Sequence, residues 1–260
     1  MLFFLIINTV MSAASDLYEK EVADYISSFG VKATRPSVSV KYPDVKITHN
    51  NATTWLEVKM NHTDNLGNTR VSYMSGEWDA AKPLDPVKKF AIEYLSKSRD
   101  TETFLKSIAK FCAKDWHTMV LPSTKGPLKD PRAIPYASLV EYFKTRTQYI
   151  LDVPKVDLGK LVTDHYIEGK AEPAHYLQAG DDFYMIGRAN PLKLPKNIPV
   201  LGVPGAGGGK CEGNFKMRIG VRSANSAYYE IQPEIKIQNM GTSKYSVKPG
   251  TTKLNPFLES

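Results

Sequence analysis

The sequence predicts a mixed α/β fold whose first half runs helix, three strands, helix, strand, with helices flanking a mixed central sheet. Helical spacing of apolar residues predicts helices at 17–29, 85–97 and 101–113. Alternating or short apolar runs bounded by polar turns predict strands at 38–47, 53–61, 70–74 and 118–122. The second half opens with helical patterns at 136–150 and 156–168 and continues with hairpin-type turns, which is typical of an α+β region rich in β-hairpins.

The first helix is expected to begin at Leu17, because Ser15 and Asp16 can accept the free N–H groups of its first turn. It should end near Gly30. Glu19 falls on the same stripe as the apolar residues of this helix, whereas Glu21 falls on the other side. An acid on the inward stripe is a candidate for a functional site, and the alternative is that Glu19 lies at the edge of the stripe and reaches water.

The two strands after this helix carry Asp44, Glu57 and Lys59. Because alternate residues of a strand share a face, Glu57 and Lys59 lie opposite the apolar side chains of their strand. Two carboxylates can hold Mg²⁺, and an adjacent ammonium can offset charge that develops on a phosphate. The pattern therefore predicts phosphodiester hydrolysis, with an ordinary solvated strand face as the alternative.

Pro43-Asp44 and Glu57-Val58-Lys59 resemble the PD-(D/E)xK signature of the restriction-endonuclease-like nuclease superfamily, whose core has the order αβββαβ. The resemblance covers roughly the first half of the chain. It implies a metal-dependent DNA endonuclease that leaves a 5′-phosphate and a 3′-hydroxyl, in a restriction, phage or mobile-element context. Mg²⁺ would be bound by Asp44, Glu57, the Val58 carbonyl and Glu19, with Mn²⁺ expected to substitute. Lys59 would act on the attacking water and the phosphate.

The second half of the chain is predicted to carry a basic surface that binds a partner. The chain has 34 basic and 27 acidic residues, a net charge of +7 and a pI of about 9.1, which suits DNA without requiring it. Lys216, Arg218 and Arg222 alternate with apolar residues, so they share one strand face and can meet successive phosphates. Arg188 and Lys210, in the loop before that strand, are further DNA-binding candidates. A solvated outer face is the alternative for each.

The domain boundary is expected in the proline-rich segment 123–135, which cannot continue a helix or central strand. This divides the chain into an apolar extension at 1–11, a nuclease core at 12–125 and an accessory, DNA-binding region at 126–260. The apolar N-terminal run lacks a basic start and is too short for a membrane span, so a signal peptide is not favoured. Cys112 and Cys211 show no metal-ligand spacing, which fits a reduced, cytoplasmic protein without a membrane partner.

The sequence is also compatible with two other functions. One is a DNA-binding protein on the same fold whose metal site is inactive, and the other is a secreted binding protein. The glycine-rich run 201–211 is not a phosphate loop, because Pro204 and Cys211 replace residues that such a loop requires. A homodimer is compatible with the sequence.

Overall fold

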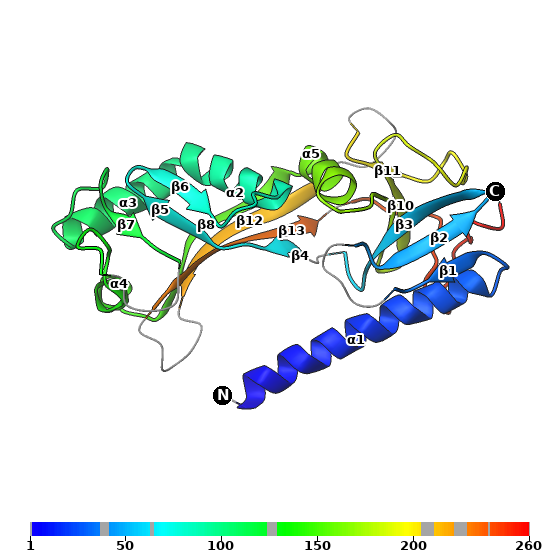
Figure 1. Cartoon of the computed structure of the whole chain (residues 1–260), viewed down its shortest axis with the longest axis horizontal. Coiled ribbons are helices and arrows are strands. Elements are labelled where there is room, and N and C mark those ends of the chain that lie inside the picture. Colours follow the sequence, from blue (N-terminus) through cyan, green and yellow to red (C-terminus); the bar gives the residue numbers. More distant parts are fainter. Residues whose placement is uncertain are drawn as a thin grey trace. The chain divides into compact units, whose positions relative to one another are not determined.

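The computed structural model describes residues 2–36, 42–62, 65–123, 129–203, 211–220, 228–238 and 240–259 (Figure 1). Its contacts divide the chain into two compact units that are interleaved in the sequence. Unit 1 comprises residues 1–64, 157–212 and 237–260, and unit 2 comprises residues 65–156 and 213–236. This division differs from the boundary expected in the segment 123–135, because the predicted core and the predicted accessory region each contribute to both units.

Unit 1 is built on a six-stranded mixed sheet with the order β1-β2-β3-β9-β10-β11. Strands β1, β2 and β3 are antiparallel neighbours, β3 runs parallel to β9, and β9 and β10 form an antiparallel hairpin. The predicted mixed α/β class with a mixed central sheet is therefore confirmed. The bounds of these strands are β1 Lys32–Thr34, β2 Val45–His49, β3 Ala52–Lys59, β9 Ala174–Ala179, β10 Asp182–Ile186 and β11 Val200–Leu201.

Helix α1 (Leu2–Ser27) starts well before the predicted position, so the expected start at Leu17 is wrong. The polar side chains that suggested a helix cap are satisfied in another way. Ser15 Oγ donates to Glu19 Oε1 at 3.2 Å, and Asp16 accepts a hydrogen bond from Arg35 at 2.8 Å. The C-terminal end agrees with the prediction, because Gly30 follows the helix with a φ of 77° that favours glycine.

The two faces of the unit 1 sheet have different roles. Leu56 and Val58 of β3 face α1 and pack in one apolar cluster with Val22 and Ile26 of that helix. By the alternation of the strand, Glu57 lies on the opposite face. Helix α5 (Gly159–Thr163) and the π-helical turn η1 (Asp164–Glu168) precede β9, and Tyr166 of η1 is fully buried.

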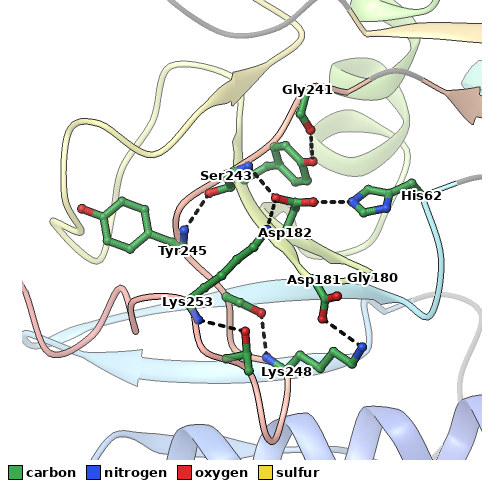
Figure 2. Close-up of polar contacts among 12 residues, drawn as sticks. His62, Gly180, Asp181, Asp182, Gly241, Ser243, Tyr245, Lys248 and Lys253 are labelled. Carbon is green, nitrogen blue, oxygen red and sulfur yellow. Dashed lines mark hydrogen bonds and ion pairs between the residues drawn. The ribbon is translucent and has the colours of Figure 1, made fainter.

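The C-terminal segment is attached to the sheet of unit 1 through Asp182, the first residue of β10 (Figure 2). Its carboxylate is buried and meets His62 Nε2 at 2.6 Å, the Ser243 N–H and Lys253 Nζ at 2.6 Å. Next to it, Asp181 pairs with Lys248 at 2.9 Å. These contacts explain why residues 240–259 belong to unit 1 although the chain passes through unit 2 before reaching them.

Unit 2 contains a four-stranded sheet, β4-β13-β12-β8, and a three-stranded sheet, β6-β5-β7. The elements expected at 70–74, 85–113 and 118–122 all exist, but they lie in unit 2 and not beside β2 and β3. Their proposed place in the nuclease core is therefore corrected, because local periodicity identifies a strand without showing which sheet it joins. The bounds are β4 Asn65–Asn68, β5 Val71–Met74, β6 Glu77–Ala80, α2 Pro86–Lys97, α3 Arg99–Phe111, β7 Val120–Leu121, α4 Tyr136–Phe143, β8 Thr147–Asp157, β12 Glu212–Gly220 and β13 Glu230–Gln238.

The helix predicted at 136–150 is half the expected length. Helix α4 stops at Phe143, since Lys144 adopts a left-handed conformation with a φ of 52°, and the chain continues as strand β8. The helix predicted at 156–168 also starts later than expected. Strand β8 continues to Asp157, and the helical part begins only at Gly159. The strands expected at 175–178 and 183–186 are confirmed as the β9–β10 hairpin.

Candidate functional site

The structure brings Asp44, Glu57 and Lys59 together on one face of the unit 1 sheet. Val45 pairs with Leu56 across β2 and β3, so Asp44, one residue before β2, lies next to β3 at the level of Glu57. Asp44 Oδ2 accepts the backbone N–H of Val58 at 2.8 Å, and Lys59 Nζ lies 2.7 Å from Glu57 Oε1. Glu57 and Lys59 are therefore held by the pairing of β3 with its neighbours, and Asp44 is tied to β3 through the Val58 N–H.

Glu57 is the most deeply buried member of this group, with 4% of its side chain exposed. Oε1 is paired with Lys59. Oε2 is also buried and accepts no hydrogen bond from any residue that the structure describes. A buried carboxylate oxygen without a donor costs about 1–3 kcal/mol, so a structure that keeps one has usually reserved it for another partner.

Lys170 is a site residue that the sequence analysis did not find. Its Nζ lies 4.0 Å from Glu57 Oε2, and only 15% of its side chain is exposed. It lies in the loop between η1 and β9, more than a hundred residues after Glu57. No motif surrounds it, and only the parallel pairing of β9 with β3 brings its loop to the site.

The charges of these groups are strongly linked. Burial raises the pKa of Asp44 to about 7, the Glu57 carboxylate adds to the shift, and Lys59 opposes it. Burial also disfavours the ionised form of Glu57, but Lys59 and Lys170 together hold the pKa of Glu57 below its ordinary value. For Lys59, burial is outweighed by Glu57, which raises the lysine pKa well above its ordinary value. At neutral pH Glu57 is therefore ionised beside the Lys59 ammonium group, and Asp44 is close to its midpoint.

Glu19 of α1 lies partly buried near this group, whereas Glu21 is exposed. Its carboxylate accepts a hydrogen bond from Arg35 Nε at 2.8 Å, and Arg35 also pairs with Asp16. The Glu19 charge contributes to the raised pKa of Asp44, so the two carboxylates interact electrostatically. Arg35, the residue that follows β1, holds Glu19 in place. The position of Glu19 on its helix does not by itself predict this contact.

Asp44 and Glu57 have the donor chemistry that Mg²⁺ requires. Mg²⁺ keeps several waters and is usually bound by one or two carboxylates, which matches two carboxylates better than a full protein cage. Within the described residues, no three His, Cys, Asp or Glu side chains are grouped so as to hold a metal ion by themselves. The buried, unbonded Oε2 of Glu57 fits a small cation at this position, and Lys59 and Lys170 would face the anion that accompanies it.

Of the residues predicted to bind DNA, the structure describes Lys216, Arg218 and Arg188. In unit 2, Lys216 and Arg218 do share a face of β12, but Lys216 pairs with Asp152 at 2.8 Å and Arg218 Nε lies 3.3 Å from Glu234. Their charges are thus largely matched by acids of neighbouring strands. Arg188 is exposed after β10 in unit 1, and Lys210 and Arg222 lie outside the described residues.

Comparisons with protein-family models, curated proteins and solved structures find no match for this chain. Across the described part of the chain, none of the helices has the length and apolar character needed to cross a membrane. The function therefore has to be argued from the geometry of the site.

The raised pKa of Asp44 predicts a pH dependence of stability. Between about pH 4 and pH 7 the unfolded chain has released this proton while the folded protein retains it, so stability should fall as the pH rises. Asp44→Asn should lack this contribution. Over that range the wild type should lose on the order of 1–4 kcal/mol more than the variant. Urea unfolding of both proteins in EDTA at several pH values measures the difference, and parallel curves would contradict the assignment.

Proposed function

We propose that this chain is a Mg²⁺-dependent DNA endonuclease of the PD-(D/E)xK type, with Mn²⁺ able to replace Mg²⁺. The observation that carries the proposal is the environment of Glu57. One oxygen of this buried carboxylate is paired with Lys59, the other accepts no hydrogen bond from the described residues, and Asp44 lies beside it. A buried carboxylate oxygen without a hydrogen bond destabilises the fold, so a purely structural role does not favour it. It is well suited to bind a cation whose preferred ligands are oxygens.

The order of elements in unit 1 supports the same proposal. Taken alone, unit 1 runs α1, β1, β2, β3, α5 and β9, which is the order αβββαβ, and β9 lies parallel to β3. Three of these elements, β1, α5 and β9, are not the segments that the sequence predicted for this core. The chain segment 65–156, which belongs to unit 2, enters the sequence between β3 and α5. Glu57 and Lys59 lie on β3 as predicted, whereas Asp44, predicted to lie within a strand at 38–47, lies immediately before β2.

The mechanism assigns a role to each residue of the site. Asp44 and Glu57 would hold the metal ion, together with the carbonyl of Val58. When bound, Mg²⁺ would act as a Lewis acid, polarising the phosphate and lowering the pKa of a water molecule. Lys59 orients the attacking water and offsets charge on the phosphate in the transition state. Glu19, held by Arg35, raises the pKa of Asp44 and would support the bound ion with its negative charge.

Lys170 supplies a second ammonium that sequence motifs do not predict. Because it faces the oxygen of Glu57 that Lys59 does not contact, it places positive charge on the far side of the carboxylate. In the proposed complex, Glu57 would help to hold the metal ion and Lys170 would pair with a non-bridging oxygen of the phosphate. The site then binds an anion and a cation next to each other, as phosphodiester hydrolysis requires.

The first test is the loss of cleavage in Glu57→Gln and Lys59→Met. Each change removes a charge at the reacting phosphate and keeps the size of the side chain, so Mg²⁺-dependent plasmid cleavage should fall on the order of a hundredfold or more. The exposed Lys32→Met is the matched control for the lysine. Far-ultraviolet circular dichroism checks the fold. Cleavage at the parent rate by either variant would remove the assignment.

The second test compares Glu19→Gln with Glu21→Gln. The two residues share a helix and a charge, but only Glu19 is linked electrostatically to Asp44. Glu19→Gln should lower kcat by roughly tenfold or more, while Glu21→Gln stays near the parent value. Initial rates at saturating Mg²⁺ measure both, and equal losses would show that the orientation of Glu19 has no catalytic role.

The third test separates Lys170 from the metal ligands. Lys170→Met removes a cation that repels Mg²⁺, so less Mg²⁺ should be needed for half-maximal cleavage, although kcat should fall roughly 10- to 100-fold. Asp44→Asn should instead require more Mg²⁺. Lys170→Arg, which keeps the charge, should recover part of kcat. If Lys170→Met requires more Mg²⁺, the lysine only stabilises Glu57 and does not contact substrate.

A further inference from the structure

An aromatic pair lies on the same sheet face as the candidate metal ligands. Trp55 and Glu57 are alternate residues of β3 and therefore point to the same side. Lys46 of β2 is the cross-strand partner of Trp55, just as Asp44 lies at the level of Glu57. The face thus carries two adjacent rows, one with Trp55 and Lys46 and one with the two carboxylates, separated by the spacing of alternate strand residues, about 6–7 Å.

Tyr42 extends the aromatic row to the surface. Its ring stacks on Trp55 with the ring centroids 5.6 Å apart and an angle of 21° between the planes. Trp55 is only 6% exposed, whereas Tyr42 is 42% exposed. The buried ring therefore supports the partly exposed one in a defined orientation. Lys46 Nζ lies 5.6 Å from the centroid of the Trp55 ring, which adds a cation to this row.

This combination has the chemistry of a base-stacking platform. Proteins that bind single-stranded nucleic acid present exposed aromatic rings on which bases stack, beside cations that meet the backbone. A ring that is already supported from below loses little conformational freedom when a base covers it. Paired bases inside a continuous duplex have both faces covered, so such a ring favours an unpaired base.

We propose that Tyr42 stacks on an unpaired nucleobase next to the scissile phosphate, with Lys46 contacting the adjoining backbone. The substrate is then a single strand, or a strand unpaired at a fork, flap or branch, and not a continuous duplex. This inference rests on the proposed nuclease function. It adds the class of DNA that the site accepts, which neither the motif nor the metal ligands determine.

Binding without metal tests the platform separately from cleavage. In EDTA, a single-stranded oligonucleotide with 2-aminopurine should show fluorescence quenching and bind the wild type more tightly than the matched duplex. Tyr42→Leu, which keeps an apolar cover over Trp55, should weaken single-strand binding by roughly 5- to 150-fold, the effect of one lost base–aromatic stack. Tyr42→Phe, which keeps the ring, should recover the quenching. Tyr149→Leu, at an aromatic residue of similar exposure in unit 2, is the matched control.

The outcomes separate the two proposals. If wild type cleaves DNA but Tyr42→Leu keeps the single-strand affinity and the quenching, the platform is overturned while the nuclease function stands. If wild type shows no quenching, the platform is overturned whether or not cleavage occurs. Quenching that depends on Tyr42, in a protein that cleaves nothing, supports the platform as a nucleic-acid site and overturns the nuclease. Lys46→Met gives a second measurement, since it should reduce the salt dependence of single-strand binding.

Discussion

The candidate site depends on the burial of the Glu57 carboxylate between two lysines. A buried charge is tolerated only where opposite charge and hydrogen bonds compensate for lost hydration. Lys59 provides both to one oxygen, while Lys170 provides charge but no hydrogen bond to the other. The lowered pKa of Glu57 and the raised pKa of Lys59 follow from this pairing, whereas the raised pKa of Asp44 comes first from its own burial and then from the Glu57 charge. The pairing keeps Glu57 ionised, and Asp44 is the group that titrates near neutral pH.

The two-sided character of β3 allows a polar site to exist inside a small unit. Its even-numbered residues Leu56 and Val58 pack against α1, and this apolar layer stabilises the strand. The odd-numbered residues are then free to carry Trp55, Glu57 and Lys59 on the other face. A shift of one residue in the pairing of β2 and β3 would exchange the two faces, so the register that stabilises the core also positions the ligands.

The interleaving of the units explains why the site draws on distant parts of the chain. After β3 the chain forms most of unit 2, and it returns through α5 and η1 to add β9 beside β3. Lys170 reaches Glu57 by this return. In unit 2, the two described basic residues of β12, Lys216 and Arg218, pair with acids on adjacent strands.

The sequence by itself determined the local elements and the chemistry of three site residues. Helical and alternating periodicity is a property of neighbouring residues, which is why β3, α2, α3 and the β9–β10 hairpin were predictable and why Glu57 and Lys59 could be placed on one face. Only the tertiary structure decided which strands share a sheet: β5 and β7 joined unit 2, and β9 took the place beside β3. It also decided that Ser15 and Asp16 lie inside α1, that Arg35 holds Glu19, that Lys170 reaches Glu57 and that Tyr42 stacks on Trp55. These depend on contacts between residues far apart in the chain, whose free energies no local pattern records.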